Sequence, residues 1–182
     1  MGSERRAGDT PERRLSAPSR EALSSAFHTQ ARSDWAVYLH LAALPEHPRC
    51  HALHYLQMAT EKLGKAYRLR DTSAATEDLQ SEHTGFASFL RLYINQRASS
   101  LAADRETNEA LRRPAVALAR EVERLHPSVD KARCPQNTEY PWPEADQVGV
   151  PVHYDFPNLS FLRDPKGRAF LALVQRAFDD FC

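Results

Sequence analysis

Apolar side chains recur every three or four residues along most of the chain, which is the period of a helix that buries one face. The first run consists of Leu23, Phe27, Ala31, Trp35, Tyr38 and Ala42. Ser19 precedes this run, and a serine at such a position caps the first turn of a helix. We therefore expect a first helix that begins near Ser19 and ends near Leu44.

Two prolines, Pro45 and Pro48, end the first helix because each lacks an amide donor and restricts the residue before it. The next apolar run starts at once and consists of Leu53, Leu56, Ala59, Leu63 and Ala66, widened by Tyr67. It predicts a second helix that continues to about Arg70. Because the connection is short, the two helices are expected to be antiparallel neighbours.

Two further runs follow a polar stretch, residues 71–84, which we interpret as a loop. The third helix is marked by Phe86, Phe89, Leu90, Tyr93 and Ile94, and is expected to continue to about Ala103. The fourth is marked by Leu111, Ala115, Leu118, Val122 and Leu125. Pro114 leaves two alternatives for the fourth helix: its regular part begins near the proline, or the proline kinks it.

The segment from His126 to about Leu162 is rich in proline and has no sustained helical period. We expect a long ordered loop rather than a helix or a sheet, and loops of this length are usually functional or tightly packed. Asp164-Pro165 then predicts the start of a last helix, with Asp164 as the N-cap and Pro165 at the first helical position. Its apolar face consists of Phe170, Leu173, Val174, Ala177, Phe178 and Phe181. The fold class predicted is all-α, an antiparallel bundle of about five helices.

The helical domain is expected to cover residues 21–182, after a flexible arm, residues 1–20. The arm is rich in Arg, Ser, Gly and Pro and has almost no large apolar side chain, so it cannot offset its ordering entropy by burial. We interpret it as a solvated tail. Its arginines are the alternative feature, since they can contact an acidic partner or phosphates.

Charge and cysteine content narrow the class of protein. Lys and Arg together number 24, as do Asp and Glu, so the summed field gives no general attraction to nucleic acid or to an anionic membrane, although a local patch can. The three cysteines are scattered without a CxxC spacing, which suits a reducing compartment. No apolar run approaches the ~20 residues that span a bilayer, and none at the N-terminus has the form of a signal peptide. A soluble cytoplasmic protein without membrane contact is expected.

Short motifs in the first three helices carry a family resemblance. The first helix contributes Asp34, Trp35 and Leu41, and the second, in HYLQMATEKLGKAY, contributes His54, Gln57, Ala59, Glu61, Lys62, Lys65 and Ala66. His83 is followed by Phe86 and Leu90 at the start of the third helix. This pattern resembles the HEPN family, whose members are small helical bundles of toxin–antitoxin, CRISPR-associated and other anti-phage systems.

The loop motif Glu139-Tyr140-Pro141-Trp142-Pro143 falls where many HEPN proteins carry an Arg-Tyr-Pro-Asp-like turn. Here Glu139 replaces the arginine and Trp142 the acidic residue. The resemblance implies a binding function for His54, Glu61, Lys65, His83, Glu139, Tyr140 and Trp142. The residues themselves also allow structural interpretations: Glu61 and Lys65 form an i, i+4 pair on a solvated face, and the two aromatic rings seal the end of the bundle with their polar tips outward rather than stack on a base.

Catalytic HEPN proteins are ribonucleases with an Arg-x(4–6)-His motif, and Arg120 with His126 matches it. An imidazole can exchange protons with the ribose hydroxyl and the leaving oxygen, while a guanidinium stabilises the phosphorane charge. The match lies at the end of the fourth helix, whereas the family motif usually opens the last helix, and Glu121 and Glu123 add negative charge beside it. We therefore expect a non-catalytic binding or regulatory component. The alternative is a metal-independent ribonuclease in which two protomers combine Arg120 and His126 in one composite site.

A histidine group near the start of the second helix consists of His47, His51 and His54. His51 and His54 lie one helical turn apart and can hold a zinc ion together, but no fourth ligand stands at a fixed spacing. We expect neither a metal nor another cofactor. Expected partners are a second copy of the chain, a protein such as a nucleotidyltransferase-like antitoxin or a defence-complex subunit, and RNA or a nucleotide. A protein-interaction scaffold outside HEPN, using Tyr140 and Trp142, is a further alternative.

Overall fold

The computed structural model describes residues 18–72, 79, 81–100 and 105–181, so most of the expected arm, residues 1–20, lies outside the described residues. Helix α1 (Arg20–Ala42) begins directly after Ser19. The hydroxyl of Ser19 accepts a hydrogen bond from the backbone N–H of Ala22, so the predicted cap is confirmed. Arg20 is the first residue of this helix, which agrees with the expected start near Ser19.

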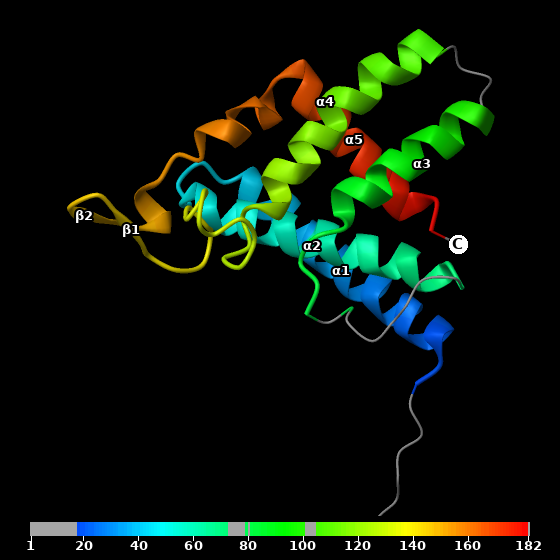
Figure 1. Ribbon diagram of the computed structural model, residues 1–182, viewed down its shortest axis with the longest axis horizontal. Helices are drawn as coiled ribbons and strands as arrows, with labels where there is room; N and C mark the ends of the chain where they lie inside the picture. The colour runs from blue at the N-terminus through cyan, green and yellow to red at the C-terminus, as the bar shows by residue number, and fades with distance from the viewer. Residues whose placement is uncertain (1–17, 73–78, 80, 101–104, 182) are drawn as a thin grey trace, which may run out of the picture.

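Helices α1 and α2 (Arg49–Arg70) form an antiparallel pair across the proline-rich turn, residues 43–48, as predicted. Ser24, near the start of α1, donates a 2.8 Å hydrogen bond to the carbonyl of Ala66, near the end of α2. Farther along α1, Asp34 accepts a 2.6 Å hydrogen bond from Lys62. The two helices lie side by side in Figure 1.

Helices α3 (Phe86–Ser100) and α4 (Arg105–Glu123) form a second pair. Pro114 lies inside α4, so the alternative in which the regular helix begins near this proline is wrong. The predicted end of the third helix near Ala103 falls on residues outside the described part of the chain.

Helix α5 (Pro165–Asp179) contacts both pairs, and its start at Asp164-Pro165 is as predicted. Its Gln175 accepts a 2.7 Å hydrogen bond from the indole of Trp35 in α1. The carbonyl of Ala177 accepts one of 2.8 Å from the hydroxyl of Tyr67 in α2. The core that the helices enclose includes Leu56, Leu63, Leu90, Val122, Phe170, Val174 and Phe178. The predicted all-α bundle is confirmed.

A long ordered connection joins α4 to α5, as predicted, but it contains short strands and 3₁₀ helices, so the expectation that it has neither helix nor sheet is wrong. Strands β1 (Trp142–Glu144) and β2 (Gln147–Gly149) form an antiparallel hairpin, seen at one end of the molecule in Figure 1. Two 3₁₀ helices follow, η1 (Pro151–His153) and η2 (Pro157–Arg163). The strands are too short to show an alternating pattern, and the turn uses Ala145 at a φ of 51° instead of the usual Asn-Gly signal.

Within the described part of the chain, none of the helices has the length and apolar character that crossing a bilayer requires.

Candidate functional site

One face of α2 carries four polar side chains at helical spacing: His54, Gln57, Glu61 and Lys65. Glu61 is central, since its Oε1 accepts a 2.6 Å hydrogen bond from Lys65 and its Oε2 accepts one of 2.7 Å from Gln57. Gln57 is 1% exposed and Lys65 8% exposed. The expectation of a solvated Glu61–Lys65 pair is therefore wrong: the pair lies inside the bundle, where each charge needs the other.

His83 lies next to Glu61 because the start of α3 approaches α2 at Gly64. A Cβ atom on Gly64 would lie 3.4 Å from the Cα of Phe86, so a larger side chain would push α3 away. The Nδ1 atom of His83 is 3.2 Å from Oε2 of Glu61. In this contact Nδ1–H donates to the carboxylate, which leaves Nε2 of His83 as an acceptor.

Glu123 ties the end of α4 to the start of α3. Its Oε1 accepts hydrogen bonds from the backbone N–H groups of Gly85 at 2.8 Å and of Ala87 at 2.9 Å. This is how an acidic side chain satisfies unpaired donors at a helix N-terminus. The contact brings the two histidines that flank it in sequence, His83 and His126, into the same space.

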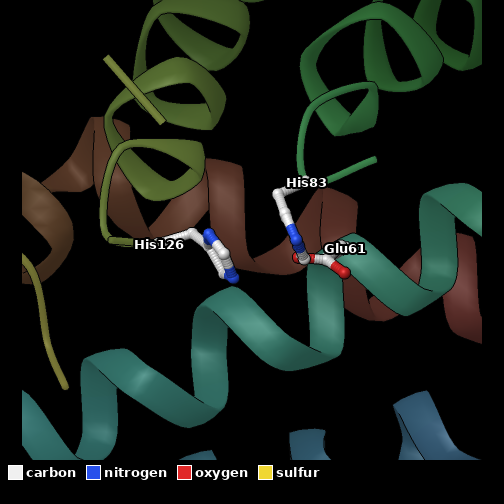
Figure 2. Close-up of side chains that lie close together, drawn as sticks. All are labelled: Glu61, His83 and His126. Atoms are coloured by element: carbon white, nitrogen blue, oxygen red, sulfur yellow. The ribbon is translucent and has the colours of Figure 1, made fainter. Parts of the chain in front are cut away.

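The rings of His83 and His126 stack face to face, with centroids 3.5 Å apart and planes inclined by 12° (Figure 2). Ser128 holds the ring of His126: its N–H donates to Nδ1 at 3.2 Å, and its hydroxyl oxygen lies 2.8 Å from the same atom. The other ring nitrogen of His126 points toward α2 in Figure 2.

We refer to Glu61, His83 and His126 as the Glu–His–His cluster. One nitrogen or carboxylate oxygen from each of the three residues lies within 4.8 Å of the corresponding atoms of the other two. Among the described residues, no other group of three His, Cys, Asp or Glu side chains comes this close. Such a cluster can exchange protons through its imidazoles or bind a cation through its lone pairs.

Glu139, from the aromatic loop motif, borders the cluster. Asn137 fixes its position, because the side-chain oxygen of Asn137 accepts hydrogen bonds from the backbone N–H groups of Glu139 at 2.9 Å and of Tyr140 at 2.7 Å. The turn is also tied to the end of α4 by a 3.2 Å hydrogen bond from Thr138 N–H to the carbonyl of Leu125. Glu139 thereby places Oε1 3.8 Å from Nδ1 of His54.

Burial and neighbouring charges shift the pKa of two cluster members. Burial raises the pKa of Glu61, but hydrogen bonds and charge from Lys65, with further hydrogen bonds, outweigh it, so this pKa lies below its usual range. Burial, and then the positive charge of His83, lowers the pKa of His126, although Glu61 and Glu139 oppose this. Near neutral pH, Glu61 is therefore ionised and His126 neutral.

Arg120, the predicted partner of His126, is exposed on α4 and lines a shallow pocket with Glu82 and Arg91. The charges that act most strongly on His126 are those of His83, Glu61, Glu139 and Lys65. Within one chain, the ring that meets His126 is that of His83.

The histidine group predicted as a weak metal candidate is not brought together. His47 and His51 are exposed, while His54 faces Glu139. Among the described residues, these three do not form a group of close ligand atoms.

The two aromatic residues of the loop motif have different environments. Trp142 is 3% exposed and packs edge-on against Tyr154, with ring centroids 5.3 Å apart. Its Nε1 atom is buried, so the expectation that its polar tip faces outward is wrong. Tyr140 is 60% exposed and lies at the surface.

No family model, no curated protein and no solved structure matches this chain.

Sequence reasoning placed His54, Glu61, Lys65, His83 and Glu139 in a site and missed three residues that build it. Ser128 orients His126, Gln57 binds Glu61, and Glu123 joins α3 to α4. The signal for Gln57 is its spacing of one helical turn from Glu61. Glu123 gave no comparable signal, because its partners are backbone groups nearly forty residues away in the chain.

Proposed function

We propose that this chain is a HEPN-like helical protein that acts as a non-catalytic binding or regulatory component of a nucleic-acid-linked system, such as a toxin–antitoxin or anti-phage assembly. The observation that carries the proposal is the convergence of residues that the family resemblance singled out. His54, Glu61, His83 and Glu139 come from three separate segments and meet around one cluster. Polar side chains that gather from distant segments are typical of binding sites.

The charge arrangement favours binding over cleavage of RNA. Cleavage of a phosphodiester needs a cation that stabilises the developing charge beside the acid and base. The charge of Lys65 is already paired, since its Nζ is held 2.6 Å from Glu61. Arg120 is exposed on α4. Among the described residues, the hydrogen bonds that reach the cluster from outside it come from Gln57, Lys65 and Ser128, and none of these donors is a guanidinium.

The test incubates the purified protein with mixed RNA and follows both electrophoretic mobility and chain length. We expect a mobility shift with intact RNA, reduced in His126→Ala and retained in His153→Ala, which removes an exposed histidine of η1. Cleavage that disappears in His126→Ala but persists in His153→Ala would contradict the non-catalytic function. In solution we expect a homodimer, with twice the 20.6 kDa mass of one chain.

The second candidate function is a metal-independent ribonuclease, and the stacked imidazoles favour it. Two rings 3.5 Å apart oppose double protonation, so one serves as acid while the other serves as base. In the composite version, a partner protomer supplies Arg120 to this pair. This function predicts cleavage that survives EDTA, is lost in both His83→Ala and His126→Ala, and is lost in Arg120→Ala if the site is composite.

A further inference from the structure

We infer that the Glu–His–His cluster is a binding site for one divalent transition metal ion of the zinc type, held by a carboxylate oxygen of Glu61 and one ring nitrogen each of His83 and His126. The inference goes beyond the proposed function because it requires neither RNA nor a protein partner. Two imidazoles and one carboxylate, with further positions left for water, suit zinc better than magnesium or calcium, which prefer oxygen ligands alone.

The spacing of the ligand atoms supports this assignment. Two ligand atoms of a tetrahedral zinc ion, bound at roughly 2.0–2.2 Å, lie about 3.3 Å from each other. The 3.2 Å between Oε2 of Glu61 and Nδ1 of His83 already has this value. An ion there takes the place of the proton that the two atoms share.

His126 is the ligand that has to move. Its nitrogen lies within 4.8 Å of the other ligand atoms, so it must approach by at most about 1.5 Å. The stacked rings tilt apart when both nitrogens face one ion. His83 lies in the segment before α3 and His126 in the turn after α4, so both rings can rotate without displacing a helix.

Ser128 supplies the support that a metal-binding histidine needs. Such a histidine binds through one ring nitrogen and donates the N–H of the other to a nearby acceptor, which fixes the ring. In the structure, Nδ1 of His126 accepts a hydrogen bond from the Ser128 N–H, so the ring proton is on Nε2. Binding of the ion through Nε2 requires the other tautomer, in which Nδ1–H donates to the hydroxyl oxygen of Ser128, 2.8 Å away, and the contact with the Ser128 N–H is given up.

The surroundings of the cluster carry a net negative charge and a hydrogen-bond acceptor without a partner, and a hydrated cation suits both. With neutral imidazoles, Glu61 and Glu139 contribute two negative charges and Lys65 one positive charge, which leaves a net charge of −1. Oε1 of Gln57 is buried without a hydrogen-bond partner among the described residues, on the same face of α2 as Glu61. Buried acceptors are rarely left unpaired, and a water molecule on the ion is a donor of the type that this atom lacks.

The test is calorimetric titration of the EDTA-treated and dialysed chain with Zn²⁺, repeated with Co²⁺ while visible absorption is recorded. We expect one ion per chain, with no detectable binding of Mg²⁺ or Ca²⁺ at the same concentrations. His83→Ala and His126→Ala should each weaken Zn²⁺ binding by more than about 100-fold, since the loss of a supporting residue alone costs about 10–100-fold. Ser128→Ala should weaken it about 10-fold.

Two control variants test whether Zn²⁺ binds at the Glu–His–His cluster rather than at any exposed histidine, and whether a change in affinity results from unfolding. His51→Ala removes an exposed histidine of α2 and should leave the affinity unchanged. Lys65→Met removes the cation that competes for Glu61 and should increase the affinity, which an unfolded variant would not do. Circular dichroism and thermal melting establish that each variant is folded.

Two results would overturn the inference. The first is no Zn²⁺ or Co²⁺ binding by the folded wild-type chain. The second is binding that persists unchanged in the folded double variant His83→Ala/His126→Ala, because the ion would then be bound elsewhere. Neither result bears on RNA binding, which is measured without added metal.

Discussion

Nζ of Lys62 lies 2.6 Å from Oδ2 of Asp34 and joins α2 to α1 inside the bundle. Asp34 is 4% exposed, so its charge depends on this partner. We expect Lys62→Met to lower the free energy of unfolding by about 3 kcal/mol, as when one partner of a buried pair is removed. Urea denaturation measures the change, with Lys166→Met on the exposed start of α5 as the control; equal values for the two variants would contradict the prediction.

The double variant Asp34→Leu/Lys62→Met tests whether the loss of stability in Lys62→Met comes from the unpaired charge of Asp34. Replacing both charges with apolar groups removes the desolvation penalty along with the attraction. The double variant should therefore be more stable than Lys62→Met alone. The coupling energy of the pair is its change in unfolding free energy minus the changes in the two single variants, Asp34→Leu and Lys62→Met.

Glu123 provides the second prediction, because its carboxylate accepts two backbone hydrogen bonds at the start of α3. We expect Glu123→Ala to lower the free energy of unfolding by about 1.5–3 kcal/mol, the range for hydrogen bonds to a charged group. Glu109→Ala, in an exposed i, i+3 pair of α4, should change it by less than about 0.5 kcal/mol. Urea denaturation of both variants under the same conditions makes the comparison. Histidine chemical shifts of His83 and His126 should also change in Glu123→Ala but not in Glu109→Ala.

Gly149 provides the third prediction, because it stands opposite Trp142 in the hairpin. A Cβ atom at Gly149 would lie 2.3 Å from Nε1 of Trp142, and the buried ring cannot move aside freely. We expect Gly149→Ala to lower the free energy of unfolding by about 1–3 kcal/mol, as for other overpacked sites. Its neighbour Val148 is 67% exposed, so Val148→Ala is the control and should have little effect. Denaturation together with the NMR signal of the Trp142 indole N–H distinguishes a local displacement from no effect.

His28 gives the chain a pH-dependent contact between α1 and the C-terminal segment. Its ring stacks on Phe181, with centroids 4.0 Å apart, and Nε2–H donates a 3.2 Å hydrogen bond to the carbonyl of Phe178. Burial lowers the pKa of His28, and the nearby Arg32 and Arg70 add to this, while the hydrogen bond opposes it less strongly. The folded state therefore binds the proton less readily than the unfolded state.

The sign of the stability change follows from that lowered pKa. The contribution of neutral His28 is present above the unfolded pKa of about 6.5 and is lost as the pH falls. We expect the free energy of unfolding to fall less between pH 7.5 and pH 5 in His28→Phe than in the wild type. NMR titration should place the midpoint of His28 below the ordinary histidine value of about 6.5. A midpoint at or above that value would refute the assignment.

The helices could be predicted from the sequence because their signals are local. Ser19 and Asp164-Pro165 mark the starts of two helices to within a few residues. The spacing of the apolar residues and the positions of the prolines locate the other helices. The hairpin formed by residues 142–149 could not be predicted in this way. Trp142 is buried in it against Tyr154 and opposite Gly149, and such contacts between side chains do not appear as a periodic pattern in strands of three residues.

The candidate site was only partly predictable for the same reason. The spacing of Glu61 and Lys65 on one helix face is visible in the sequence, whereas their burial depends on α3 and α4 covering that face. The motif Arg120 to His126 singled out a histidine of the cluster, but it gave no indication of His83, whose ring stacks on that histidine within the chain. The partner, His83, is fixed by Gly64 and Glu123, which act through the backbone of α3 and leave no pattern that a linear motif can contain.

The position of α5 bears on how this protein is made. Phe170 and Phe178 fill the centre of the core, and Gln175 and Ala177 bond to side chains of the first two helices. During translation, the helices synthesised earlier therefore lack their common neighbour until α5 has left the ribosome. A chain stopped before residue 165 leaves the apolar surface that α5 covers exposed to solvent, and chaperones bind such surfaces.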